Sequence, residues 1–457
     1  MTLRFGTDGI RGVANRDLSP ELVAALGRAA ARVLGTDRPF FVGRDTRRSG
    51  PLLEAALVAG LCSEGAGVER VGVLPTPGVA YLGQLYDGPG AVISASHNPF
   101  PDNGVKLFAS GGRKIADEPE RRIEAELRRL VDGGQRFAAR TGAEGGPEGT
   151  HVGVARDRLG ADADYIAHLA AALGGRRLDG QSVVVDCGNG AAFEVAPWAL
   201  RVCGASVRVL HDQPDGTNIN AGCGSTDPTE LQEAVVAAGN SIGLAFDGDA
   251  DRVIAIDEGG NLVDGDQMLA IIALDLHERG ALRGDAVVAT VMSNFGLRRA
   301  LAEHGLGLVE TQVGDRNVLT ALEAHGLSLG GEQSGHLILA DLATTGDGTL
   351  TGLVLLDVMA RRGRPLAELA AVVPALPQVL RSVRVGDRAG LEEDSGFRAE
   401  LAAVEQQLGA DGRVLVRPSG TEPVVRVMVE APTTEVAETA VTRLAAAVER
   451  ACGPAAG

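Results

Sequence analysis

Aromatic residues are scarce in this chain of 457 residues: phenylalanine, tyrosine and tryptophan make up 3% of it, with 1 tryptophan. Large rings therefore contribute little to the core, and packing must come from alanine, valine and leucine. Cysteine is also rare. The 5 cysteines form no CxxC pair and their number is odd, which argues against a disulfide framework. We expect them to be reduced core residues of a cytosolic protein.

Positive charge is in deficit, because 43 Lys and Arg stand against 60 Asp and Glu, a formal net charge of −17. This balance argues against nucleic acid or an anionic membrane surface as a partner. An anionic small substrate would then need a local basic cleft within an acidic shell.

Long apolar runs are missing as well. No stretch approaches the ~18 consecutive apolar residues that indicate a membrane span. The opening residues MTLRF have neither the basic nor the apolar region of a signal peptide. We therefore expect a cytoplasmic protein with no membrane partner.

Glycine and small apolar residues are abundant: there are 63 glycines, and 45% of the chain is hydrophobic. Such a composition is typical of layered α/β folds with many tight turns. The length predicts three or four domains. Residues 20–33 read as a helix capped by Ser19, and strands at 40–42, 68–74 and 91–94 alternate with helices. This alternation predicts a mainly parallel sheet.

Buried strands that run into small-residue turns recur at residues 41–45, 182–190 and 286–294, which predicts three similar α/β units. The last part of the chain has strands near 378–385, 413–417 and 424–430 and two helices, which predicts an α+β unit of another type. We predict four domains, at residues 1–155, 156–255, 256–370 and 371–457.

Ser96 follows the apolar run at residues 91–94 and precedes Asn98 and Pro99. A hydroxyl at the exit of a strand is exposed to reactants, and the Asn-Pro pair forces the backbone out of regular structure. The pattern makes Ser96 a candidate covalent phosphoryl carrier, although an ordinary Asx-type turn has the same appearance. Lys106 lies ten residues later and can return to the serine from a neighbouring strand, or be a solvated surface lysine.

Three carboxylates, Asp247, Asp249 and Asp251, alternate along a loop between two apolar runs. This spacing lets all three point at one place, where a hard divalent cation would relieve their repulsion. An EF-hand is excluded because Arg252 stands where that loop needs glycine, and strands replace its flanking helices. The alternative is an acidic turn in water.

Two later loops offer groups that bind phosphosugars. The run RPSGTEP at residues 417–423 combines a guanidinium, hydroxyls and open backbone amides, as phosphate binding requires, and it equally resembles a plain turn. The run GEQSGH at residues 331–336 places a carboxylate, an amide, a hydroxyl and an imidazole side by side, which suits sugar hydroxyls. His336 alone is more typical of a structural histidine. Arg316 adds a basic turn upstream.

Taken together, these motifs resemble the α-D-phosphohexomutases over nearly the whole chain, from GTDGIRG at residues 6–12 to the loop at 417–423. Gln333, the segment 314–316 and the segment 344–348 favour the glucosamine branch over the phosphomannomutase/phosphoglucomutase branch. The resemblance implies three related α/β domains with mixed, mainly parallel sheets and a C-terminal α+β domain around a central cleft.

The resemblance also implies roles for individual residues. Ser96 would be the phosphoserine, and one Mg²⁺ would be held by its phosphate with Asp247, Asp249 and Asp251. Charge neutralisation and proton transfer would fall to Arg11, Arg252, His97 and Lys106. The substrate would be held by Glu332, Ser334, His336, Arg316, Arg417, Ser419, Gly420 and Thr421.

The implied reaction interconverts glucosamine 6-phosphate and glucosamine 1-phosphate through glucosamine 1,6-bisphosphate, and feeds amino-sugar nucleotide (UDP-N-acetylglucosamine) and cell-wall precursor synthesis. Family membership further implies a kinase or a bisphosphate to prime Ser96, and is compatible with a homodimer. Two other classes are open to test. An aspartyl-phosphate phosphatase using Asp247 and Asp249 would leave the Ser96 turn without a role. An inactive phosphosugar-binding regulator would have lost a catalytic part.

Overall fold

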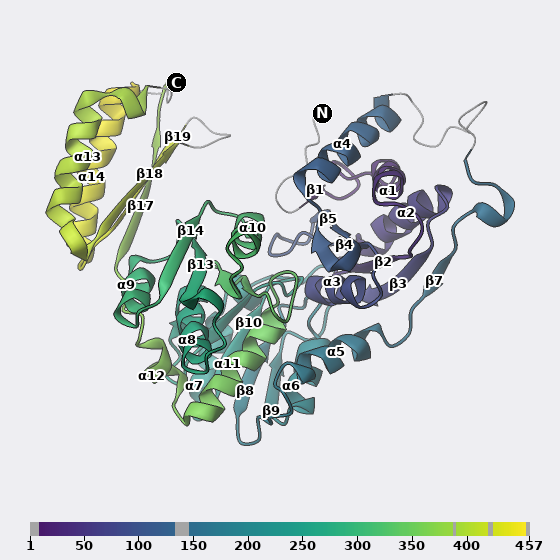
Figure 1. The fold of residues 1–457 in the computed structure, drawn as a ribbon, viewed down its shortest axis with the longest axis horizontal. Coiled ribbons are helices and arrows are strands. Elements are labelled where there is room, and N and C mark those ends of the chain that lie inside the picture. The colour runs from purple at the N-terminus through teal and green to yellow at the C-terminus, as the bar shows by residue number, and fades with distance from the viewer. Residues whose placement is uncertain (1–8, 133–145, 387–389, 419–423, 454–457) are drawn as a thin grey trace. The chain divides into compact units, whose positions relative to one another are not determined.

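The computed structural model describes residues 9–132, 146–386, 390–418 and 424–453 (Figure 1). The chain divides into two compact units. One comprises Met1–Val291 with Gly307–Val372, and the other comprises Met292–Leu306 with Val373–Gly457. Each unit is described by itself.

The first sheet has the strand order β1-β5-β4-β2-β3-β7, with β6 paired to β5. Strands β4, β2, β3 and β7 are parallel to one another, whereas β5 is antiparallel to both β4 and β1. Its strands are β1 Ile10–Val13, β2 Phe40–Arg44, β3 Val68–Val73, β4 Gly90–Ile93, β5 Asp102–Ala109, β6 Arg113–Lys114 and β7 Ala155–Asp157. The helices of this part are α1 Pro20–Leu34, α2 Gly50–Ser63, α3 Thr76–Leu85 and α4 Asp117–Asp132.

Helix α1 illustrates how the sequence sets these elements. Ser19 caps it by accepting a hydrogen bond from the amide of Leu22 at 3.3 Å, and Pro20 occupies the first turn, where its missing N–H costs nothing. The helix ends at Gly35, as its sequence predicts. Its apolar face packs into a core shared with α2 and the sheet.

The second and third sheets have the strand orders β12-β11-β10-β8-β9 and β14-β13-β15-β16. Their strands are β8 Ser182–Asp186, β9 Ser206–Leu210, β10 Ile242–Phe246, β11 Val253–Ile256, β12 Leu262–Val263, β13 Ala286–Thr290, β14 Gly307–Thr311, β15 Leu329–Gly331 and β16 Leu337–Leu339. The helices are α5 Ala161–Ala171, α6 Val195–Val202, α7 Thr229–Ala238, α8 Gly265–Glu278, α10 Asp315–His325, α11 Gly348–Arg362 and α12 Leu366–Ala370.

All three sheets share a pattern of four strands: β5-β4-β2-β3, β11-β10-β8-β9 and β16-β15-β13-β14. In each, three strands are parallel and the end strand forms an antiparallel hairpin with its neighbour. The expected repetition of three similar α/β units is thereby confirmed. The sheets are mixed and mainly parallel, as predicted, because each hairpin brings its last strand back antiparallel.

The second compact unit contains a three-stranded antiparallel sheet of order β17-β19-β18, and α13 and α14 pack on it over one apolar core. This is the predicted α+β arrangement. The unit's elements are α9 Phe295–Glu303, β17 Gln378–Arg384, α13 Ser395–Leu408, β18 Arg413–Pro418, β19 Val424–Glu430 and α14 Thr434–Cys452. The four sheets of the described residues agree with the α/β fold class, whereas the boundaries at 155, 255 and 370 stay a prediction.

The surface loop predicted at residues 140–149 lies largely outside the described part of the chain. No helix of the described residues is long and apolar enough to cross a membrane.

The start of α11 depends on a buried carboxylate, Asp347. It accepts hydrogen bonds from the amide of Leu350 at 2.9 Å and from the hydroxyl of Tyr165, on α5, at 2.8 Å. Burial raises the pKa of Asp347 to about 6, because the charged form loses its hydration. In the unfolded chain the same group has its ordinary value of 3.8.

Between these two pKa values the folded chain holds a proton at Asp347 that the unfolded chain has lost. This contribution to the free energy of unfolding is complete below pH 3.8 and disappears as the pH rises through about 6. It amounts to about 3 kcal/mol. In Asp347→Asn the contribution is absent, so from pH 4 to pH 7 the parent should lose more stability than the variant. Urea midpoints measured across this range test the difference, with the exposed Asp162→Asn as the matched control. Parallel pH profiles for parent and Asp347→Asn would contradict it.

Candidate active site

Ser96 lies in the turn between β4 and β5, and its backbone is in the left-handed region with a φ of 52°. Its side chain is buried, so the prediction that the strand exit leaves the hydroxyl exposed is wrong, because the turn of the second sheet that carries Asp247 packs against it. The Ser96 amide donates to the hydroxyl of Ser94 at 2.9 Å, while the Ser96 hydroxyl donates to Asp247 Oδ2 at 2.5 Å. His97 Nδ1 lies 3.3 Å from the same hydroxyl. The predicted strand-exit serine is therefore present, and it points at a carboxylate and an imidazole.

The three alternating carboxylates lie in the corresponding turn of the second sheet, between β10 and β11. Asp247, Asp249 and Asp251 are all buried, and they offer ligand oxygens within 4.8 Å of one another. The alternative of an acidic turn in water is therefore wrong, since burial is too deep for solvent to screen the charges. The glycine between the first two carboxylates allows this approach: a Cβ on Gly248 would lie 2.6 Å from the Ser96 carbonyl oxygen.

Lys106 counters the negative charge of this cluster. It lies on β5 opposite Val92, and its Nζ donates to Asp249 Oδ2 at 2.6 Å and to Asp251 Oδ2 at 2.8 Å. Its side chain is 5% exposed, so it is no surface lysine. Thr76, at the start of α3, donates a further hydrogen bond to Asp249 Oδ2 at 2.6 Å.

The carboxylates consequently differ in acidity. Burial and the charges of Asp251 and Asp249 raise the pKa of Asp247 well above its ordinary value. Burial also opposes ionisation of Asp249 and Asp251, but Lys106 outweighs it, and both pKa values lie below the ordinary one. Asp247 is thus the carboxylate least able to carry its charge without a further cation.

The cluster fits a divalent metal ion. Asp249 Oδ1 and Asp251 Oδ1 are buried and have no hydrogen-bond partner among the described residues. Buried, unsatisfied carboxylate oxygens are costly, and oxygen donors of this kind are the ligands that Mg²⁺ and Ca²⁺ prefer.

Two arginines lie close enough to His97 for their charges to act on it. Arg11 lies on β1 and Arg252 follows the carboxylate turn, and the amide of Arg252 donates to Asp247 Oδ1 at 3.2 Å. Burial, followed by the positive charges of Arg252 and Arg11, lowers the pKa of His97. His97 is therefore neutral near pH 7 and able to accept a proton.

The third hairpin, between β15 and β16, carries Glu332, Ser334 and His336. Glu332 Oε1 accepts a hydrogen bond from the amide of Gly314 at 3.1 Å, and Ser334 is exposed. His336 is buried, and burial lowers its pKa to about 4. A Cβ on Gly335 would lie 1.9 Å from the carbonyl oxygen of Val253, the first residue of β11. The hairpin that carries the predicted sugar-binding residues therefore packs directly beside the hairpin that carries the three carboxylates.

Other predicted substrate residues are engaged within the protein. Arg316 donates to Asp117 at 2.9 Å and to Glu120, both on α4. Gln333 donates to Asp264 Oδ2 at 3.2 Å. Their predicted roles in sugar recognition stay predictions.

The predicted phosphate loop belongs to the second compact unit. Arg417 lies on β18, opposite Arg426 of β19. Ser419, Gly420 and Thr421 lie outside the described residues. The assignment of these four residues to phosphate binding also stays a prediction.

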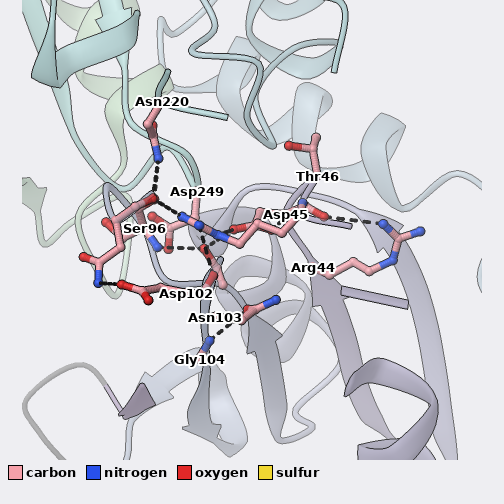
Figure 2. A network of polar contacts seen from close by, with 12 residues as sticks. Arg44, Asp45, Thr46, Ser96, Asp102, Asn103, Gly104, Asn220 and Asp249 are labelled. Carbon is pink, nitrogen blue, oxygen red and sulfur yellow. Dashed lines mark hydrogen bonds and ion pairs between the residues drawn. The ribbon is translucent and has the colours of Figure 1, made fainter. Parts of the chain in front are cut away.

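Sequence reasoning missed three residues that touch the Ser96 turn or the carboxylates: Arg47, Asn220 and Thr76. Figure 2 shows the Asn220 amide pointing at the Ser96 backbone. One signal was available for Arg47, since Asp45 directly follows a buried strand and can start an Asx turn. Asn220 and Thr76 have no such signal, because they reach the site only through the packing of separate segments.

Comparisons with known proteins agree with this geometry. Residues 2–132, 163–260 and 264–376 match the phosphoglucomutase/phosphomannomutase alpha/beta/alpha domains I, II and III, and residues 380–447 match the C-terminal domain of that family. A phosphoglucosamine mutase from Salinispora tropica is 54% identical over 453 residues, covering 98% of each chain.

Two solved structures are similar over nearly their whole length. A phosphoglucomutase/phosphomannomutase family protein from Burkholderia thailandensis has a TM-score of 0.80 at 26% identity, covering 99% of this chain and 98% of that one. The N-acetylphosphoglucosamine mutase of Aspergillus fumigatus, in complex with GlcNAc-6P and magnesium, has a TM-score of 0.69 at 20% identity, covering 98% and 96%. With its four matched domains and its close relatives, the chain belongs to the phosphoglucomutase/phosphomannomutase family.

Proposed function

We propose that this chain interconverts glucosamine 6-phosphate and glucosamine 1-phosphate, with Ser96 as the phosphoryl carrier. One observation carries the mechanism: a buried serine hydroxyl bonds to one carboxylate of a buried triad, with a neutral imidazole 3.3 Å away. The similarity to the Salinispora phosphoglucosamine mutase supports the substrate class and does not favour the phosphomannomutase/phosphoglucomutase alternative.

The reaction has two phosphoryl transfers. In the first, O1 of glucosamine 6-phosphate attacks the phosphorus of phosphoserine 96, the bond from phosphorus to Ser96 Oγ breaks, and the proton of the attacking hydroxyl passes to a base. In the second, the bisphosphate has turned over: Ser96 Oγ attacks the phosphorus at O6, and O6 leaves as a hydroxyl by taking up the proton. The product is glucosamine 1-phosphate, and Ser96 carries a phosphoryl group again.

His97 is our candidate for the proton acceptor, because its lowered pKa keeps it neutral and its Nδ1 lies beside the Ser96 hydroxyl. Lys106 is held by two carboxylates, which favours the ammonium form. It therefore suits proton donation or charge neutralisation better than proton abstraction. Arg11 and Arg252 add positive charge where the transferring phosphoryl group spreads its own.

Asp247, Asp249 and Asp251, together with the phosphate of Ser96, would hold Mg²⁺, which neutralises charge on the transferring phosphoryl group when bound. The Aspergillus structure was described with magnesium, which supports the choice of ion. Glucosamine 1,6-bisphosphate as intermediate and activator is part of the same proposal.

The remaining assignments also follow from the family. Glu332, Ser334, His336 and Arg316 would bind the sugar, and Arg417, Ser419, Gly420 and Thr421 the phosphate that does not react. The four-domain boundaries, a cytoplasmic location, a homodimer and the priming of Ser96 by a kinase or a bisphosphate belong to the proposal. A phosphatase with Asp247 as nucleophile is disfavoured, because the serine whose hydroxyl bonds to Asp247 would have no role.

Ser96→Ala should lower mutase turnover by at least about a thousandfold, because the group that carries the phosphoryl is removed. Coupled assay of glucosamine 1-phosphate formation measures turnover, and mass spectrometry maps phosphate to the Ser96 peptide. The exposed Ser110→Ala is the matched control and should keep full activity. Turnover near the parent rate in Ser96→Ala would sink the covalent mechanism, and phosphate mapped to Asp247 would favour the phosphatase.

Asp249→Asn and Arg417→Ala should affect different constants. Asp249→Asn should weaken Mg²⁺ binding and lower kcat about a hundredfold with little change in KM, because the metal acts where charge develops. Arg417→Ala should raise KM by roughly ten- to a hundredfold and leave kcat nearly unchanged, because it binds the phosphate that does not react. Steady-state kinetics at several Mg²⁺ concentrations separate the two, with Asp162→Asn as control. If both variants changed kcat and KM in the same proportion, the assignment of Asp249 to the chemical step and of Arg417 to substrate binding would be wrong.

Amino-sugar preference is a further expectation. A pocket whose groups pair with a 2-amino group pairs poorly with a 2-hydroxyl. Each poorly paired buried group costs ~1–3 kcal/mol of binding free energy. We expect kcat/KM for glucosamine 6-phosphate to exceed that for glucose 6-phosphate and mannose 6-phosphate by at least about tenfold. Competition among the three substrates on the phosphorylated protein decides it. Preference for a plain hexose would move the chain to the phosphomannomutase/phosphoglucomutase branch.

A further inference from the structure

Arg47 is a fully buried arginine next to the Ser96 turn, and its position is set by the end of strand β2. Asp45 follows that strand and is itself buried. Its Oδ1 accepts from the Arg47 amide at 2.9 Å, and its Oδ2 accepts from Arg47 Nε at 2.8 Å and from the hydroxyl of Ser94 at 2.7 Å. The guanidinium is thus held at one edge by a carboxylate that also contacts the strand leading to Ser96.

The rest of the guanidinium faces backbone carbonyls of the Ser96 turn. Arg47 Nη2 donates to the carbonyl oxygens of Ser96 at 2.8 Å and Asn98 at 2.7 Å. Arg47 Nη1 donates to those of Pro99 at 2.6 Å and Asp102 at 3.1 Å. With the bond to Asp45, these contacts match the five N–H donors that a guanidinium has. One buried side chain therefore binds four carbonyls of a single turn.

Asn220 approaches the same carbonyls from the loop between β9 and α7. Its Nδ2 donates to the carbonyl oxygen of Ser96 at 2.9 Å and to that of Asn98 at 3.2 Å (Figure 2). The backbone N–H of Asn220 donates to the carbonyl oxygen of Gly188 at 2.9 Å. The Ser96 carbonyl is therefore bound from two different sheets of the first compact unit.

The turn needs such binding because its own conformation is unfavourable. Ser96 has a φ of 52°, a region that residues with a side chain adopt at a cost. Several carbonyl dipoles also converge on one place, and they repel one another unless donors separate them. Release of the turn would let Ser96 rotate away from Asp247 and His97. A displacement of about 1 Å at a reacting group can cost about a hundredfold in rate.

We propose that Arg47, assisted by Asn220, is a positioning residue that holds the Ser96 turn in the conformation from which Ser96 transfers its phosphoryl group. The inference rests on the proposed function for its effect on rate, whereas the order of the turn can be measured without it. Arg47 acts through the backbone and touches no reacting atom, so its loss should change the rate of transfer and leave substrate binding nearly intact.

The experiment compares Arg47→Ala, Arg47→Lys and Asn220→Asp with Arg28→Ala. Arg28 is the matched control: it is a buried arginine of the same sheet's helices, paired with Glu64 at 2.9 Å, and it lies on α1 away from the turn. Lysine keeps the charge of Arg47 but offers three donors from a single atom. Asn220→Asp keeps the shape of the side chain and replaces the donor by an acceptor facing two carbonyls.

In Arg47→Ala we expect kcat to fall by about a hundredfold or more while KM changes less than about threefold. Arg47→Lys should recover little of this loss. Guanidinium chloride, at concentrations far below those that unfold the protein, should restore part of the activity of Arg47→Ala. It should not raise the activity of the control Arg28→Ala, whose kcat we expect to stay near that of the parent. Asn220→Asp should lower kcat by about tenfold, again with a KM change of less than about threefold. Hydrogen exchange of the peptide covering residues 94–104 should quicken in the Arg47 and Asn220 variants and stay unchanged in Arg28→Ala.

Parent-like kcat in folded Arg47→Ala, or unchanged hydrogen exchange of the 94–104 peptide, would overturn the proposal. If Arg47→Ala does not fold, Asn220→Asp decides the question by the same measurements. If the parent protein has no mutase activity, the proposed function fails, and hydrogen exchange of the turn still tests the positioning role by itself.

Discussion

The repulsion among three buried carboxylates is the constraint on which the site depends. Asp247, Asp249 and Asp251 bring their oxygens within 4.8 Å of one another away from water, where like charges interact strongly. Lys106 offsets two of the charges, while burial and the repulsion that remains raise the pKa of Asp247. That carboxylate is the one that accepts the Ser96 hydroxyl. The proposed function puts the phosphoryl carrier and a metal ion at this place, where positive charge is lacking.

A repeated strand pattern explains how the fold builds this place. The Ser96 turn joins β4 to β5, the carboxylate turn joins β10 to β11, and the sugar-loop turn joins β15 to β16. Each is the antiparallel hairpin at the same position of its sheet. Glycines permit the hairpins to touch, since a Cβ on Gly248 would meet the Ser96 carbonyl and one on Gly335 would meet that of Val253. The same hairpin, repeated in three sheets, therefore carries three different sets of polar side chains.

Charge also holds the backbone of the site in place. Asp45 directly follows β2 and Asp186 is the last residue of β8, and each accepts a hydrogen bond from the backbone amide two residues later. In the first sheet this turn points the guanidinium of Arg47 at four carbonyls, whereas in the second the carboxylate also accepts the amide of Gly224. Phosphoryl transfer asks for little covalent chemistry from the protein and much from positioning. Under the proposed function, the buried ionic groups around the Ser96 turn would meet that demand.

The sequence alone determined the helices, strands and chemical groups, because apolar periodicity, capping residues and alternating carboxylates are local properties. The helix starting at Pro20, the strand before Ser96 and the triad were all predictable. Tertiary structure decided the rest. It placed β5 antiparallel to β4 and buried Lys106 against the carboxylates. It paired Arg316 with Asp117 of α4. It also brought Arg47 and Asn220 to one carbonyl. The side-chain contacts among these join segments that are distant in the sequence, from 49 residues for Arg47 and Ser96 to 199 residues for Arg316 and Asp117. Local patterns do not encode the pairing of partners so far apart, since it arises only when separate segments pack together.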